Sequence, residues 1–119
     1  MKLSEIVKIV AGKYCTAAPQ KDLTINGGCG ADLMSDVLAT AQPESVLLTG
    51  LNNPQAIRTA QMADIRAIIF VRGKVPSAEM VAIAENEGIP LISSPYGMFE
   101  LCGRLHAAGL PSHEDHFQE

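Results

Sequence analysis

Small polar and basic residues follow three short apolar runs of this chain, and their types could do chemistry. They lie at residues 49–53, 72–74 and 93–96, and each group precedes a helical pattern. In an open parallel α/β sheet such segments gather outside the carboxyl ends of the strands, where ligands usually bind. There they could hold a nucleotide or another small anion; ordinary solvent-facing loops are the alternative. The predicted ligand-binding residues are Thr49, Asn52, Arg72, Gly73, Lys74, Ser93 and Ser94.

No obvious catalytic set accompanies these residues. Every histidine lies in the last fourteen residues, so no Ser/His/Asp arrangement is indicated. Asp32 and Asp36, one turn apart on a predicted helix, could ligate a hard cation or act as acid and base. A solvated helix face or an interface contact is the alternative for this pair. We therefore expect recognition or regulation rather than an enzyme, and no cofactor.

Two further groups have residue types that suit a ligand. Gly27, Gly28 and Gly30 could present backbone N–H groups to a phosphate, but their spacing matches neither the P-loop nor the dinucleotide fingerprint. A tight turn with positive φ is the alternative. Zinc is usually bound by cysteine and histidine, and the chain has such residues at Cys102, His106, His113 and His116. A buried thiol and a solvated tail are the alternative there, and we predict no metal site.

The composition of the chain argues against several classes of function. A length of 119 residues fits one domain, and a net charge of −4 argues against nucleic acid or an anionic membrane as partner. No apolar run resembles a signal peptide or a membrane span. Three widely spaced cysteines suit a reducing cytoplasm, with Cys15 and Cys29 interpreted as packing residues. Because only 18% of the residues are charged, the surface has room for an apolar patch and for self-association.

Hydrophobic periodicity predicts the elements that position these residues. Helices are expected at 4–10, 32–40, 53–63, 77–87 and 97–107, and strands at 13–17, 23–25, 46–48, 67–71 and 91–93. Residues 26–30 are expected to break regular structure. Asn53 and Ser77 are predicted N-caps and Gly88 a left-handed C-cap. The alternation after residue 46 predicts a small three-layer α/β domain with a mainly parallel sheet and helices on both faces. The domain is expected to span 1–110, with a flexible tail at 111–119.

The segment at residues 31–39 resembles the signature helix of the DRTGG domain family. The resemblance continues in order through 46–50, the helix start at Asn53, and 68–74, 87–92 and 98–105. The run that names the family is not present as such, and residues 26–30 occupy its neighbourhood.

The resemblance implies a non-catalytic regulatory unit with dimer contacts, similar to modules of CBS-domain pyrophosphatases and phosphotransacetylases. Stand-alone versions are similar to proteins encoded beside iron-only hydrogenase subunits and serine kinases related to HPr kinase. We therefore expect a homodimer that binds a small anionic ligand, with an adenine nucleotide as the candidate, or that binds a partner enzyme. The dimer is expected to form through the helix at 32–40, with Met34 or Leu38 facing the second copy. A small nucleotide-dependent phosphotransfer enzyme and a metal or cluster accessory protein are the alternatives.

Overall fold

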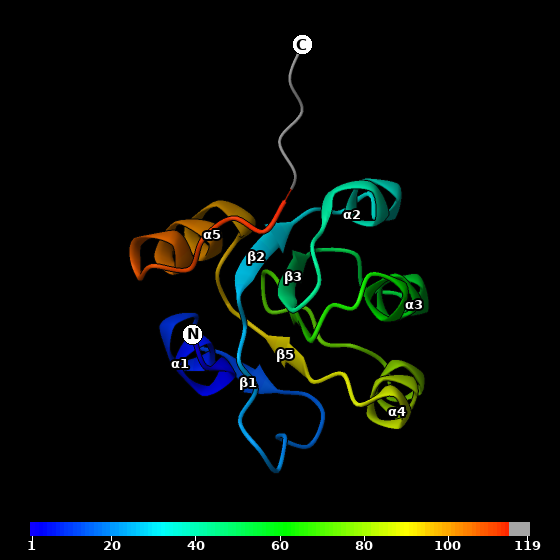
Figure 1. Ribbon diagram of the computed structural model, residues 1–119. Helices are drawn as coiled ribbons and strands as arrows, with labels where there is room; N and C mark the ends of the chain where they lie inside the picture. The colour runs from blue at the N-terminus through cyan, green and yellow to red at the C-terminus, as the bar shows by residue number, and fades with distance from the viewer. Residues whose placement is uncertain (115–119) are drawn as a thin grey trace.

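A five-stranded sheet divides the molecule into three layers in the computed structural model, which describes residues 1–114 (Figure 1). Its strands are β1 (Lys13–Tyr14), β2 (Gly27–Gly30), β3 (Ser45–Thr49), β4 (Ala67–Phe70) and β5 (Leu91–Ser93). They lie in the order β1-β5-β4-β3-β2. Strands β2 to β5 are parallel, and β1 pairs with β5 in the antiparallel sense.

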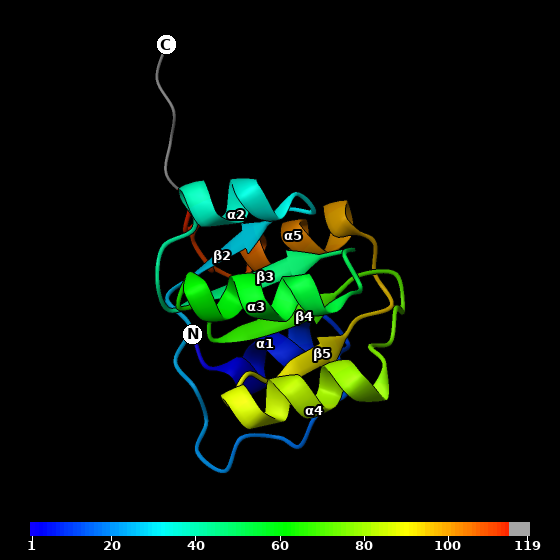
Figure 2. The ribbon, with the colours of Figure 1, turned by 90° about the vertical axis from the view of Figure 1, so that its right-hand side faces the viewer.

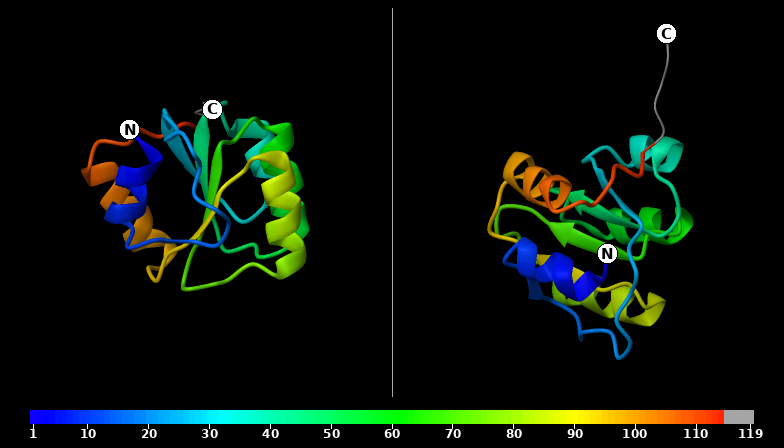
Figure 3. Two further views of the ribbon diagram at one scale, coloured as in Figure 1. Left: turned by 90° about the horizontal axis from the view of Figure 1, so that it is seen from below. Right: turned by 60° about the vertical axis from the view of Figure 1, so that its left-hand side comes forward.

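Helices cover both faces of the sheet. α1 (Leu3–Ile9) and α5 (Met98–Ala107) lie on one face, and α2 (Met34–Thr40), α3 (Pro54–Met62) and α4 (Ala78–Glu87) lie on the other (Figures 1 and 3). This arrangement confirms the predicted three-layer α/β class. No helix within residues 1–114 is long and apolar enough to cross a membrane.

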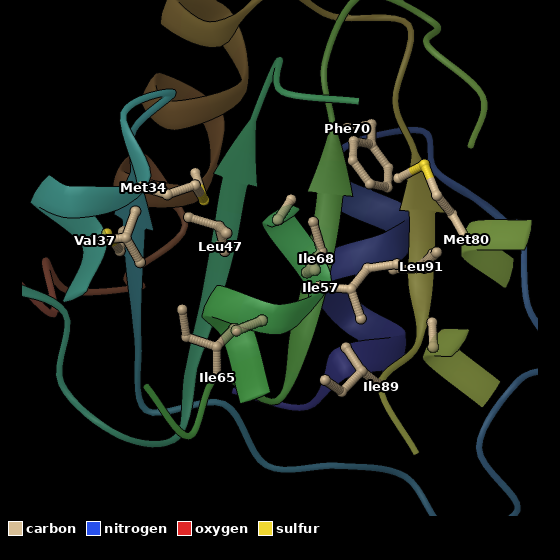
Figure 4. Packing of buried hydrophobic residues seen from close by; sticks show 14 residues of the cluster. Met34, Val37, Leu47, Ile57, Ile65, Ile68, Phe70, Met80, Ile89 and Leu91 are labelled. Atoms are coloured by element: carbon tan, nitrogen blue, oxygen red, sulfur yellow. The ribbon is translucent and has the colours of Figure 1, made fainter. Parts of the chain in front are cut away.

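The two faces of the sheet carry separate cores. β3 and β4 are buried throughout, as expected for parallel strands covered on both sides. Toward α2, α3 and α4, the side chains of Leu47, Ile57 and Ile68 pack together (Figure 4). Toward α1 and α5, Ile6 and Leu101 belong to the second cluster. The short connections between these buried strands and their helices bring the loops after the strands to one edge.

The predicted helix boundaries after residue 50 are confirmed by their caps. The Asn53 side chain accepts a hydrogen bond from Gln55 N at 2.9 Å, and Ser77 Oγ accepts one from Met80 N at 3.2 Å. Gly88 ends α4 with a φ of 71°, in the left-handed region where glycine is favoured. These caps fix where the loops of the strand-end edge begin.

Before residue 35 the predictions were less accurate. The expected strand at 23–25 is absent, and Thr24 makes only an isolated bridge to Lys2. Residues 26–30 do not break regular structure, because Gly27–Gly30 forms β2 and pairs in parallel with β3. α2 begins at Met34 rather than at Asp32. In each case pairing with a distant segment decides the local structure.

Residues 111–114, here called the C-terminal strap, lie along the outer edge of β2 (Figure 1). Gly28 N donates to Pro111 O at 2.9 Å, and His113 N donates to Gly28 O at 2.8 Å. Gln42 N donates to His113 O at 3.0 Å. The expected boundary of a flexible tail at residue 111 therefore needs correction, because the strap is bonded to the domain. Residues 115–119 lie outside the described part of the chain.

Candidate functional site at the strand ends

The carboxyl ends of the parallel strands meet at one edge of the sheet, as the sequence predicts. The loops after β3, β4 and β5 lie on the same side of the molecule (Figure 2). Val71 N donates to Thr49 O, and Ser94 N donates to Phe70 O. These hydrogen bonds between neighbouring strands hold the loops side by side. All seven predicted ligand-binding residues belong to these strand ends and loops. Their side chains nevertheless have different surroundings.

Arg72 combines an exposed side chain with an unusual backbone. Its φ is 58°, and Gly73 follows with a φ of 67°. Arg72 N donates to Tyr96 O at 2.8 Å and Gly73 N to Ser94 O at 2.7 Å, and these bonds hold both residues in the left-handed region. A methyl group added at Gly97 would lie 3.8 Å from Arg72 Nε. Within residues 1–114 the guanidinium has no hydrogen-bond or ion-pair partner, which leaves its donors to solvent or a ligand.

Lys74, in contrast, is bonded within the protein. Its Nζ donates to Gly50 O at 2.7 Å, while Asp32 Oδ1 accepts from Gly50 N at 2.7 Å. Asp32 thus binds the backbone N–H of Gly50, and Lys74 binds its carbonyl group. A methyl group added at Gly50 would lie 3.4 Å from both Asp32 Oδ1 and Lys74 Nζ. The Asp32 carboxylate near this ammonium group offsets part of its positive charge.

Asp32 is the residue of this edge that the sequence analysis missed. Asp32 does not share a helix face with Asp36, because it precedes α2 and accepts a hydrogen bond from the residue after β3. Thr49 Oγ1 donates to Asp32 Oδ1 at 3.2 Å and accepts from Leu51 N at 3.1 Å. These hydrogen bonds fix the shape of the loop after β3. Because Asp32 lies there and Asp36 lies on α2, the two carboxylates do not form the acid–base pair that the sequence suggested.

The other predicted hydroxyl and amide groups also bond to backbone carbonyl groups, at the end of α1 and in the β4–α4 loop. Ser94 is buried, and its Oγ donates to Val10 O at 2.8 Å. Asn52 Nδ2 donates to Val75 O at 3.0 Å, and Ser93 Oγ donates to Lys74 O at 2.8 Å. These bonds position the β4–α4 loop, which carries Arg72.

A cavity of about 880 Å³ opens beside this edge, between β1, the end of β5 and α4. Apolar groups and small residues make most of its wall, and Lys13 and Glu85 are its charged residues. The Tyr14 side chain packs on the other face of the sheet, in the cluster that contains Ile92. Burial raises the pKa of Tyr14, and the charge of Asp22 adds to this, so the phenol stays protonated at neutral pH. The lining residues are Ala11, Lys13, Tyr14, Cys15, Gly73, Val75, Pro76, Ala78, Val81, Ala82, Glu85, Ser93 and Pro95.

No local sequence signal reveals this cavity, because its walls come from segments far apart in the chain. β1 and α4 become neighbours only because β1 joins the sheet beside β5. Two predicted residues, Gly73 and Ser93, lie in both the strand-end edge and the cavity wall. The cavity is therefore continuous with the predicted site.

A smaller groove of about 350 Å³ lies between α5, β2 and the strap. Cys102, His106 and Glu114 line it, but no group of three metal-ligating side chains that could hold an ion occurs within residues 1–114. His113 instead faces Ser45, with Nδ1 2.5 Å from Oγ. Because Ser45 Oγ donates to Gln42 O at 2.6 Å, the histidine Nδ1–H is the donor in this pair. His116, the remaining residue of the metal hypothesis, lies outside the described residues.

The thiols around this groove are held in the neutral form. Burial raises the pKa of Cys29 to about 12, and the charge of Glu114 adds to this effect. Burial also raises the pKa of Cys102, again with a contribution from Glu114. A thiolate is the nucleophile and the metal ligand, so these cysteines are poor in both roles near neutral pH.

The glycine cluster has a steric role in β2. Neither the phosphate loop nor the positive-φ turn is present, because Gly27, Gly28 and Gly30 have no positive φ. A methyl group at Gly30 would lie 3.3 Å from Cys102 Sγ, and one at Gly28 would lie 3.3 Å from Leu110 Cδ2. The small residues let α5 and the segment that follows it approach the sheet closely.

Comparisons with known proteins agree with the fold. A model of the DRTGG domain family matches residues 5–108, whereas no curated protein sequence matches the chain. A similar solved structure contains the CBS and DRTGG domains of the regulatory region of Clostridium perfringens pyrophosphatase, complexed with its activator diadenosine tetraphosphate. The TM-score is 0.69 at 17% identity, over 92% of this chain and 47% of that one. This chain therefore spans about half the length of that structure, and the likeness shows the shared fold.

Proposed function

Because this chain belongs to the DRTGG domain family, we propose that it is a non-catalytic regulatory or accessory module that binds a small phosphorylated ligand at its strand ends. The similar solved domain is part of a regulatory region that was crystallised with a nucleotide activator. That context supports a ligand response in this chain.

Arg72 is the observation that carries the proposal. Ala11, Glu44, Asp64 and Arg72 are non-glycine residues with a positive φ, and Arg72 is the cation among these four. Residues held in such strained conformations occur at ligand sites. Here the strained backbone aims a guanidinium without an internal partner toward Gly97, beside the carboxyl ends of β4 and β5. A guanidinium can donate two parallel hydrogen bonds to a phosphate. Arg72 is thus the proposed phosphate ligand, and Asp32 and Lys74 hold the neighbouring loop.

Thermal denaturation with and without ligand tests this proposal. The probes are ATP, ADP, AMP, diadenosine tetraphosphate and pyrophosphate. A ligand that binds only the native state raises the melting temperature. We expect Arg72→Ala to remove the shift and to raise the Kd measured by calorimetry at least about tenfold, or ~1.4 kcal/mol.

Arg58→Ala is the matched control, since Arg58 is an exposed arginine in the middle of α3. It should keep the full shift, and its own stability should change by less than about 0.5 kcal/mol. A ligand-induced shift that survives in the double variant Arg72→Ala/Lys74→Ala would place the site elsewhere.

We also propose self-association through the outer face of α2. Leu33 and Leu38 are 61% and 46% exposed there, whereas Met34 is 3% exposed and points into the core (Figure 4). The expectation that Met34 could face a second copy was therefore wrong, and a charge at Met34 would test folding instead. Leu38→Glu should give a monomer by light scattering at micromolar concentration, with Phe99→Glu, at an exposed apolar residue of α5 on the opposite face of the sheet, as control. Wild-type protein that is already monomeric there would contradict the proposal.

The identity of a partner enzyme rests on the family resemblance. A hydrogenase subunit or a serine kinase related to HPr kinase is the proposed partner, in the cytoplasm. The three free cysteines are compatible with a reducing compartment.

A further inference from the structure

The outer edge of β1 carries unpaired backbone groups. β1 pairs with β5 on one side, whereas the strap covers the outer edge of β2. Cys15 N donates to Leu91 O at 2.8 Å, so the backbone of Cys15 faces β5. Successive residues of an antiparallel strand turn their N–H and C=O groups to opposite sides. Those of Tyr14 therefore point away from β5, and within residues 1–114 no backbone hydrogen bond occupies that side.

The cavity of about 880 Å³ between β1 and α4 lies beside this edge. Of the helices within residues 1–114, α4 is the last on its face of the sheet (Figure 1), and β1 extends beyond it. Val75 is 66% exposed in the cavity wall, and Ala78 and Ala82 are exposed on α4. Exposed apolar patches with a polar rim mark interaction sites. The unpaired backbone of β1 thus adjoins an apolar surface that a side chain could cover.

Lys13 supplies a free positive charge on the same face. Side chains alternate between the two faces of a strand. Tyr14 packs toward α1 and α5, so Lys13 and Cys15 belong to the face of α4. Lys13 is exposed, and within residues 1–114 its ammonium group has no hydrogen-bond or ion-pair partner. Opposite charges that face each other on neighbouring strands attract. An added strand would therefore be favoured by an acidic residue opposite Lys13.

These features together fit an extended segment, because a helix would leave the backbone groups of Tyr14 without partners. A strand that runs antiparallel to β1 can exchange both hydrogen bonds with Tyr14 through a single residue. The residues before and after that one turn their side chains to the face of α4. The first stands opposite Cys15, beside the apolar wall of the cavity, and the second stands opposite Lys13.

We propose that the outer edge of β1 binds an extended segment of a partner protein, added antiparallel to β1, in which an apolar residue is followed two positions later by an acidic residue. This inference rests on the proposed role as an accessory module and does not involve the phosphate site at Arg72. β1 has two residues, and a short edge with a lysine discourages pairing with arbitrary strands. The two side chains that face α4 therefore select the partner, as pockets do in other cases of strand addition.

Fluorescence polarisation of labelled peptides with the full chain tests the proposal. The probe is Ser-Thr-Leu-Thr-Asp-Thr-Ser. The matched control, Ser-Thr-Leu-Asp-Thr-Thr-Ser, has the same composition but places leucine and aspartate on opposite faces of the added strand. A third peptide is the probe with an N-methyl group on its central threonine, which removes the N–H that would bond to Tyr14 O. We expect the probe to bind at least about tenfold more tightly than either of the other peptides.

Substitutions in the protein test the two side-chain contacts separately. Lys13→Glu should weaken binding of the probe, and replacing the aspartate of the probe by lysine should restore binding to this variant. Ala82→Glu places a charge in the apolar wall and should also weaken binding of the probe. Ala107→Glu, at an exposed alanine of α5 on the other face of the sheet, is the matched control and should bind the probe as wild type does.

Three results would overturn the inference: equal affinity for the probe and the control peptide, no effect of the N-methyl group, or no binding of the probe at millimolar concentration. Self-association that Ala82→Glu abolishes and Leu38→Glu does not would overturn it in favour of a second copy of this chain at the edge. The phosphate proposal is tested independently. Ala82→Glu should keep the ligand-induced rise in melting temperature, and Arg72→Ala should keep binding of the probe.

Discussion

At the scale of single residues, the strand-end edge stores conformational strain in Arg72. The left-handed region costs a residue with a Cβ roughly 1–2 kcal/mol, and glycine avoids this cost. Arg72 has a φ of 58° and donates its backbone N–H to Tyr96 O. The strain persists because the loop around Ser94 and Tyr96 fixes the backbone on both sides. A residue chosen only for stability at this position would be glycine.

Arg72→Gly should therefore leave the unliganded protein as stable as wild type or more stable, by up to about 1 kcal/mol. The matched change Arg58→Gly, inside α3, should destabilise by about 1 kcal/mol because glycine is unfavourable in a helix interior. Urea denaturation of the two variants measures both values. Equal losses of stability in the two variants would show that Arg72 is not strained. Loss of the nucleotide response in the stabilised Arg72→Gly variant would show that the guanidinium, and not a change in stability, carries the response.

At the scale of elements, β2 forms because of the segments that pair with it and not because of its own residues. It has the sequence Gly-Gly-Cys-Gly, which has low intrinsic strand propensity. It forms because β3 pairs with it on one side and the strap lies along the other. Gly27 is fully enclosed: a methyl group there would lie 2.6 Å from His113 Cγ and 3.0 Å from Pro111 O.

Gly27→Ala should destabilise the protein by ~1–3 kcal/mol, because the new methyl group forces the strap away from β2. Gly103→Ala should have the opposite sign. Gly103 lies within α5 and has nothing within 4 Å of an added methyl group, so alanine should stabilise the helix by ~0.5–1 kcal/mol. The free energy of unfolding from urea titration measures both. A neutral Gly27→Ala would mean that the strap does not hold its position against β2.

At the scale of the whole molecule, the two ends of the described chain close the sheet at opposite edges. β1, near the N-terminus, covers β5, and the strap covers β2. Exposed strand edges invite pairing with other chains, so both segments protect the sheet as well as stabilise it. The strap adds the Ser45–His113 contact to its backbone bonds.

Truncation tests the role of the strap. We expect the chain that ends at residue 110 to be less stable than the chain that ends at 114 by ~2 kcal/mol. This estimate assumes about 0.5–1.5 kcal/mol for each lost hydrogen bond. The difference corresponds to a fall in melting temperature of about 10 °C for a domain of this size. Comparing these two chains isolates residues 111–114. Equal melting temperatures would show that residues 111–114 do not stabilise the domain.

The elements after residue 45, and the edge at which the strands end, could be predicted from local sequence patterns. Apolar runs, the caps at Asn53 and Ser77, and Gly88 are local signals, and local signals suffice where each strand leads into its own helix. The family was also recognisable, because its pattern is spread in order along the chain. The same local signals brought Arg72, Lys74 and the polar residues of the neighbouring loops to one edge.

The contacts that those residues make at this edge could not be predicted from local patterns, because they depend on how the strands pack. Asp32 became a loop ligand of Gly50, and Lys74 became its partner, because β2 and β4 end on either side of β3. The glycines of β2, the strap and the cavity beside α4 depend on contacts between segments far apart in the sequence. Such contacts follow from packing in three dimensions, which no residue pattern within one segment encodes. Lys74 and Ser94 form side-chain hydrogen bonds within the fold. The Arg72 guanidinium has no such partner among residues 1–114, which is why it is the cation of the predicted set that can bind a ligand.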